Sequence, residues 1–237
     1  MQYQVVLFDA DGTLFDFARA ESYALEEAFR ELGLGYRSEF LRVYEVINHE
    51  AWRRFERGEI TSQELRILRF TQFRAKLGMQ TDPERLSRTY LAWLARAEFL
   101  LEGARELVEA LAGKVRLAIV TNGLKDVQRG RFGRSPIRTY FEEIVISEEV
   151  GAQKPDPVIF EHTLRRLDHT DKSSVLMVGD SLSSDIQGGV NFGIDTCWYN
   201  PGHAEAPRSP TPRHVIHTLD QLLSICLPGN GGVEHRG

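Results

Sequence analysis

The sequence predicts an α/β protein: a doubly wound parallel sheet with a Rossmann-like core, interrupted by a small inserted four-helix cap domain. Short apolar runs, separated by segments with helical spacing, predict buried parallel strands. Polar residues follow three of these runs directly and a fourth through a loop, where parallel sheets place their ligands. The stretch at residues 16–98 has helical spacing throughout, which predicts the inserted cap.

The first strand is predicted at residues 5–8, a four-residue apolar run that ends at Asp9, Ala10, Asp11 and Gly12. Two carboxylates two residues apart at a strand end form a candidate active site. The alternatives are a turn rich in Asp and Gly, or a fragment of a calcium-binding loop. The calcium alternative is disfavoured, because an EF-hand has its glycine at position six and a helix before it.

Four helices are predicted within residues 16–98. Apolar residues with helical spacing mark the first two, at 25–32 and 40–55. Thr61 and Glu64 form a capping box that opens the third helix. Asp82 and Pro83 supply an N-cap and a helix-starting proline for the fourth.

The later apolar runs carry further polar residues to the same predicted edge of the sheet. Thr121 and Asn122 follow the run at 117–120, and a loop leads from the run at 144–146 to Lys154. Asp180 and Asp185 follow the run at 175–178. Because parallel strands share one carboxyl edge, these segments are expected to converge on one site. The expected domains are a catalytic core at 1–15 and 99–225, a cap at 16–98 and a flexible tail at 226–237.

These motifs, in this order, resemble the haloacid dehalogenase superfamily of aspartate-nucleophile phosphatases. The resemblance implies that Asp9 is the nucleophile and Asp11 the general acid and base. It also implies that Thr121 and Asn122 bind the phosphoryl group, that Lys154 is a charge clamp, and that the predicted metal-site residues are Asp9, Asp11, Asp180 and Asp185, the last an outer-sphere partner. Relatives that are dehalogenases or ion pumps replace the second carboxylate, which is Asp11 here.

The predicted charges require a cation. Four carboxylates would face one lysine and a phosphate ester, and two like charges ~4 Å apart cost about 4 kcal/mol at an effective dielectric near 20. Oxygen ligands without Cys or His favour Mg²⁺ over zinc, and Mn²⁺ is expected to substitute. Attack by Asp9 would form an aspartyl phosphate, which water then hydrolyses.

The substrate is expected to be selected by the cap. The segments at 48–52, 58–62 and 146–151, with Leu14 and Phe15, resemble bacterial 5'-nucleotidases that act on pyrimidine nucleoside monophosphates. Phe17, Asn48 and Trp52 have the chemistry to stack on a pyrimidine and bind its edge, although core packing is an equal or better explanation for Asn48 and Trp52. The alternatives are a sugar-phosphate phosphatase or phosphoglucomutase and, outside the enzymes, a phosphoacceptor switch.

Composition restricts partners and location. The chain has 237 residues, 42% of them hydrophobic, and a net charge of −5, which disfavours a nucleic-acid polymer as partner. Cys197 and Cys226 are expected to be reduced packing residues. The first strand leaves no room for a signal peptide, and no apolar run approaches ~18 residues, so no membrane contact and a cytoplasmic location are expected. A monomer or homodimer acting on a small phosphomonoester is consistent with all of this.

Overall fold

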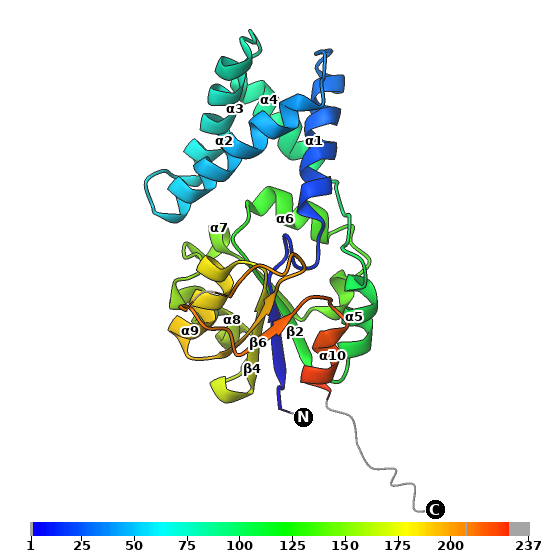
Figure 1. Ribbon diagram of the computed structural model, residues 1–237, viewed down its shortest axis with the longest axis vertical. Coiled ribbons are helices and arrows are strands. Elements are labelled where there is room, and N and C mark those ends of the chain that lie inside the picture. The colour runs from blue at the N-terminus through cyan, green and yellow to red at the C-terminus, as the bar shows by residue number, and fades with distance from the viewer. Residues whose placement is uncertain (1, 207, 228–237) are drawn as a thin grey trace, which may run out of the picture. The chain divides into compact units, whose positions relative to one another are not determined.

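The computed structural model describes residues 2–206 and 208–227, which divide into two compact units (Figure 1). The first unit, here the sheet unit, contains the described residues up to Asp16, Leu100–Asn122 and those from Pro136 onward. The second, here the helical unit, contains Phe17–Phe99 and Gly123–Ser135.

The sheet unit is built on a parallel sheet that has six strands in the described part of the chain. Their order is β3-β2-β1-β4-β5-β6, and all adjacent pairs are parallel. The chain builds outward from β1 through β2 to β3 and then returns to β4 on the other side of β1. This reversal is the topological switch point of a doubly wound sheet, and it confirms the predicted fold class. The strands are β1 (Val5–Phe8), β2 (Arg116–Thr121), β3 (Glu143–Ile146), β4 (Val175–Gly179), β5 (Asp195–Tyr199) and β6 (His214–Ile216).

Helices cover both faces of this sheet, which explains why the central strands are apolar on both sides. Figure 1 shows α8 (Pro157–Arg166) and α9 (Gln187–Phe192) on one face, and α5 (Ala104–Leu111) and α10 (Gln221–Cys226) on the other. Val5 and Leu7 pack with residues of α8 in one buried cluster. Val6 and Phe8 alternate with them and are also fully buried. The remaining short helices are α7 (Ser147–Val150), 3₁₀ turns at Arg138–Tyr140 and Lys172–Ser174, and a π-helical turn at Leu182–Ile186.

The helical unit contains α1 (Phe17–Glu31), α2 (Glu39–Glu56), α3 (Ser62–Leu77) and α4 (Pro83–Leu94). The capping box is present: the Thr61 side chain accepts from the Glu64 backbone N–H, and the Glu64 side chain accepts from the Thr61 backbone N–H. The Asp82 carboxylate caps α4 by accepting from the Glu84 N–H. These local signals therefore start α3 and α4 at the predicted positions.

A fifth helix of the helical unit, α6 (Lys125–Phe132), follows β2 in the chain. It packs on α4, and this close packing explains the glycine at residue 130. An added Cβ there would lie 2.9 Å from the carbonyl oxygen of Ala95, the residue that follows α4. The buried Arg131 donates through Nε to the Ala97 carbonyl at 3.1 Å. The helical unit thus differs from the expected range 16–98 by including a segment distant in sequence.

The end of the described chain is ordered further than expected. Cys226 is the last residue of α10 and is buried, whereas the tail was expected to begin there. Residues 228–237, the rest of the expected tail, lie outside the described residues. Cys197 and Cys226 are free and buried, as expected of packing residues, and their reduced state stays a prediction. Among the described helices, none has the length and apolar character needed to cross a membrane.

Candidate active site

The predicted core residues converge at the carboxyl edge of the sheet, around its switch point. Asp9 follows β1, and its backbone N–H donates to Val178 of β4 at 2.9 Å. Thr121 is the buried last residue of β2, in register with Ile146 of β3. Asp180 directly follows β4. Parallel pairing alone therefore brings these remote segments together.

Lys154 lies between two carboxylates of this edge. Its Nζ is 2.5 Å from Asp9 Oδ1 and 2.7 Å from Asp185 Oδ1. The lysine and Asp185 are each 1% exposed, and Asp9 is 6% exposed. Buried charges persist only when they are paired and hydrogen-bonded, and here one ammonium group satisfies two carboxylates from different segments.

Asn122 holds the backbone of Lys154. Its Nδ2 donates to the Lys154 carbonyl and its Oδ1 accepts from the Lys154 N–H, both at 2.8 Å. The amide therefore ties the end of β2 to the loop that carries the lysine. Sequence reasoning assigned Asn122 to the phosphoryl group and missed this contact, because only the fold brings residues 122 and 154 together.

The turn after β4 fixes Asp185. The side chain of Ser181 caps the π-helical turn by accepting from the Ser184 N–H, and the Ser181 N–H donates to Asp185 Oδ2 at 3.0 Å. Gly179 is needed here, because an added Cβ would lie 2.2 Å from Asp185 Oδ2. Asp185 thus lies five positions after Asp180 in the sequence, while the turn folds both toward one point.

Asp180 is held by two contacts that sequence reasoning did not anticipate. Thr13 Oγ1 donates to Asp180 Oδ1 at 3.3 Å, and the indole of Trp198 on β5 donates to the Asp180 carbonyl at 2.9 Å. Gly12 has φ +87°, and an added Cβ there would lie 2.5 Å from Asp180 Oδ2. In the first motif, Gly12 therefore leaves room for the Asp180 carboxylate and Thr13 hydrogen-bonds to it, next to Asp11 in the same loop.

The electrostatics of this cluster favour an added positive charge. Burial raises the pKa of Asp9 well above its usual range, against the lowering effect of Lys154, and the charges of Asp185 and Asp180 raise it further. Burial and Asp185 raise the pKa of Asp180 to about 7. Burial would lower the pKa of Lys154, but Asp185 and Asp9 outweigh it, so the pKa is raised and the ammonium form is secure.

The arrangement fits a divalent cation. Oxygen atoms of Asp9, Asp180 and Asp185 lie within 4.8 Å of one another, and Lys154 is the one cation paired with them in the described contacts. Such a set of carboxylate oxygens suits magnesium. The structure therefore groups three of the four carboxylates predicted for the metal. Asp11, the fourth, is half-buried in the loop after β1 and stands outside this group.

The three predicted specificity residues meet in a hollow of about 730 Å³ within the helical unit. Phe17 and Trp52 are half-buried in it, and both also pack against the core of that unit. Asn48 is only 4% exposed, with both ends of its amide hydrogen-bonded to protein. Packing and pocket lining, treated as alternatives from sequence, therefore coexist at these positions. The hollow is lined by Phe17, Glu21, Glu45, Val46, Asn48, His49, Glu50, Trp52 and Arg53.

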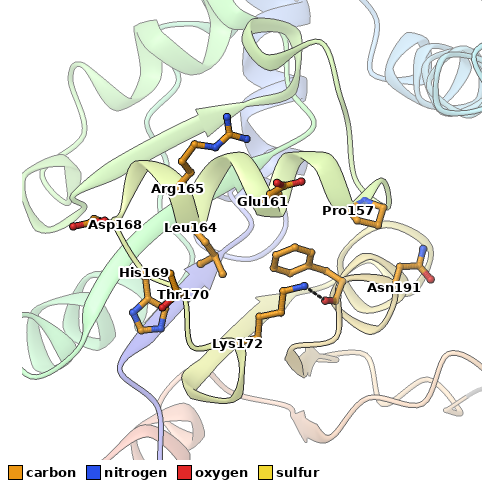
Figure 2. A pocket seen from close by; sticks show the side chains of 10 residues that line it. Pro157, Glu161, Leu164, Arg165, Asp168, His169, Thr170, Lys172 and Asn191 are labelled. Atoms are coloured by element: carbon orange, nitrogen blue, oxygen red, sulfur yellow. Dashed lines mark hydrogen bonds between the residues drawn. The ribbon is translucent and has the colours of Figure 1, made fainter.

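A second hollow, of about 570 Å³, lies in the sheet unit beside α8 and α9 (Figure 2). Lys172 donates to the Phe192 carbonyl at 2.9 Å and lies 3.6 Å from the centre of its ring. The lining residues described for this hollow include none of those predicted for the site. It is therefore separate from the carboxylate cluster.

Comparisons with known proteins agree with this arrangement. The sequence profile described as "Haloacid dehalogenase-like hydrolase" matches residues 6–199. The chain is 37% identical to the pyrimidine 5'-nucleotidase YjjG of Escherichia coli (strain K12), over 94% of this chain and 99% of that protein. It is 36% identical to the pyrimidine 5'-nucleotidase PynA of Streptococcus pneumoniae, over 97% of each.

A solved structure is also similar. The crystal structure of the putative HAD-hydrolase YfnB from Bacillus subtilis, bound to magnesium, superposes with a TM-score of 0.89 at 33% identity. The match covers 96% of this chain and all of that one.

Proposed function

This chain belongs to the haloacid dehalogenase-like hydrolases, and from that premise we propose that it is a magnesium-dependent phosphomonoesterase acting on pyrimidine nucleoside 5'-monophosphates. The observation that carries the proposal is Lys154, buried between Asp9 and Asp185 at the sheet's switch point, with Asp180 beside them. The pyrimidine nucleotidase names of two relatives, each matching more than nine-tenths of the chain, support the substrate class.

In the proposed reaction, Asp9 attacks the phosphorus atom and the ester oxygen leaves, which gives an aspartyl phosphate on Asp9. Lys154 lies 2.5 Å from Asp9 and favours the ionised form that the attack requires. Asp11 gives a proton to the departing oxygen and later takes one from the water that hydrolyses the intermediate. The water attacks phosphorus, so inorganic phosphate and free Asp9 are the products.

The other residues hold charge and geometry. Asp9, Asp180 and Asp185 are the proposed holders of Mg²⁺, which when bound supplies positive charge to the phosphoryl oxygens. Thr121 is proposed to donate its hydroxyl to the same oxygens. Asn122 is proposed to act through Lys154, whose backbone it fixes at both N–H and C=O. Such fixed charges and dipoles provide most of the rate in phosphoryl transfer.

Specificity is proposed to reside in the helical unit, where Phe17 and Trp52 offer ring faces for a base. The test is a panel of nucleoside monophosphates and sugar phosphates, assayed with Mg²⁺ on the intact enzyme and on Phe17→Ala. We expect pyrimidine nucleotides to be preferred. Phe17→Ala should lower kcat/KM for them by about 10-fold, a loss near 1.4 kcal/mol.

p-Nitrophenyl phosphate is the control, because it carries no base. Phe17→Ala should hydrolyse it almost normally. Equal losses on both substrates would assign the effect to folding or closure of the helical unit. A wild-type preference for hexose phosphates would replace the proposed substrate by the runner-up, a sugar-phosphate phosphatase or phosphoglucomutase. The expected cytoplasmic location stays a prediction.

A further inference from the structure

Three helices of the helical unit are joined by a buried polar chain. Asn48 on α2 donates through Nδ2 to Glu21 Oε1 on α1 at 2.7 Å, and Arg69 on α3 donates through Nη1 to Asn48 Oδ1 at 2.7 Å. Glu21, Asn48 and Arg69 are 5%, 4% and 1% exposed. Together these three residues form a hydrogen-bonded chain, the amide bridge.

Arg69 is costly to the fold. Its Nε and Nη2 atoms are buried without a hydrogen-bond partner, and its guanidinium carbon lies 5.4 Å and 5.5 Å from the ring centres of Phe70 and Tyr90. The attraction of a cation to ring faces offsets only part of its desolvation free energy. An apolar residue would pack here at less cost, so a role outside packing would explain the arginine.

That role follows from hydrogen-bond polarity. A guanidinium can only donate, and an ionised carboxylate can only accept. With Arg69 on one side and Glu21 on the other, the Asn48 amide has a single satisfied orientation, oxygen toward Arg69 and nitrogen toward Glu21. A side chain at residue 69 that cannot donate would leave the Asn48 oxygen without this partner, so that only the bond to Glu21 would hold the amide.

Two members of the amide bridge also line the hollow that contains Phe17 and Trp52. They are its buried polar part, whereas the other charged lining residues, Glu45, His49, Glu50 and Arg53, are exposed. Binding sites of this kind combine apolar walls with a few oriented polar groups. The Glu21 carboxylate, which accepts, lies beside the amide nitrogen of Asn48. That nitrogen has a second hydrogen besides the one it donates to Glu21.

We propose that Glu21 and Asn48 read the edge of the substrate's base as an adjacent acceptor and donor, and that Arg69 positions Asn48 for this. The proposal rests on the pyrimidine nucleotide function proposed above. The complementary edge is a ring N–H next to a carbonyl oxygen, as uracil presents at N3 and O4. Glu21 would accept from N3–H, and Asn48 would donate to O4. Arg69 touches no substrate and is a positioning residue.

The test compares UMP with 3-methyl-UMP, in which a methyl group replaces the N3 hydrogen. The intact enzyme should show at least about a 10-fold lower kcat/KM for 3-methyl-UMP, since a site built to accept an N–H leaves its carboxylate unpaired with the analogue. In Glu21→Gln this ratio should fall to within about 3-fold of unity, because the Gln amide has no fixed polarity.

Glu27→Gln is the matched control. Glu27 is also on α1 and is 7% exposed, but it pairs with Arg30 and is absent from the lining described for the hollow. It should keep the wild-type ratio. Arg69→Met should lower the ratio, and Arg69→Lys, which also only donates, should restore part of it; a purely structural role would change stability and leave the ratio constant.

The intact enzyme decides the matter even if a variant fails to fold. Equal kcat/KM for UMP and 3-methyl-UMP would overturn the reading of the base edge and leave the nucleotidase proposal standing. No preference for either nucleotide over hexose phosphates would overturn both. An unchanged ratio in Glu21→Gln would remove Glu21 from the proposed role.

Discussion

At the scale of single residues, the charge balance of the site depends on Lys154. It satisfies Asp9 and Asp185 in a region where neither carboxylate is appreciably exposed. Removing one member of such a buried set leaves the others with uncompensated charge, so these positions couple folding to chemistry. Asn122 contributes indirectly, because its two hydrogen bonds to the backbone of Lys154 fix the position of that residue.

The two carboxylates of the first motif should fail differently when replaced. Asp9→Asn should abolish turnover and prevent any covalent intermediate, because the nucleophile is lost. Asp11→Asn should also block turnover of nucleotides. With p-nitrophenyl phosphate, however, it should form the intermediate slowly, since that leaving group needs no proton. Intact-protein mass spectrometry after rapid acid quenching measures the phosphorylated fraction. A phosphorylated Asp9→Asn protein would contradict the assignment.

At the scale of elements, the turn between β4 and the π-helical segment determines where Asp185 lies. The strand ends at Gly179, and the Ser181 cap turns the chain so that Asp185 returns over the strand end toward Lys154. A π-helical turn is rare and is often found at functional sites. The close approach at Gly179 is what this path requires of the sequence.

Gly179→Ala should therefore lower activity sharply. The new Cβ would lie 2.2 Å from Asp185 Oδ2, so the carboxylate must move from its place beside Lys154. We expect kcat/KM for p-nitrophenyl phosphate to fall by about 100-fold or more, which corresponds to about 2.7 kcal/mol. Gly202→Ala is the control, because nothing lies within 4 Å of a Cβ at that position. Comparable activity of the two variants would contradict this prediction, because it would mean that the turn accommodates the added Cβ without displacing Asp185.

At the scale of the whole molecule, the cation should link stability to pH. The raised pKa of Asp180, about 7, means that the folded state favours its protonated form. Without a divalent metal, this contribution to stability is complete at low pH and is lost as pH rises through about 7. Mg²⁺ competes with that proton and binds only the folded site, so it should stabilise the protein more at high pH.

Thermal melting in EDTA and in Mg²⁺ at pH 5 and pH 8 measures this linkage. In EDTA at pH 8, the Tm of the intact protein should be lower than the Tm of Asp180→Asn. The gain in Tm of the intact protein with Mg²⁺ should be larger at pH 8 than at pH 5.

Activity should disappear in EDTA and return with Mg²⁺ or Mn²⁺, while Ca²⁺ should inhibit because its larger, looser shell misplaces the nucleophile. Full activity after exhaustive chelation would contradict the metal assignment.

The fold class and the sheet edge that carries the core motifs could be predicted from the amino-acid sequence alone. Parallel strands have an invariant geometry, so apolar runs followed by Asp9, Thr121 and Asp180 already place these residues at one edge. Helix starts were equally predictable, as Thr61 and Asp82 show, because caps act within three residues of the chain.

Contacts between residues remote in sequence could not be predicted and became known from the folded structure. No local pattern indicates that Asn122 holds Lys154, that α6 joins the helical unit through Gly130, or that Asn48 is oriented by Arg69 and Glu21. Periodicity assigns a residue to a face of its helix or strand, whereas hydrogen-bond partners depend on how faces meet. The reactive side chains at the strand ends could therefore be predicted from the sequence, whereas the residues that orient them were identified only in the folded chain.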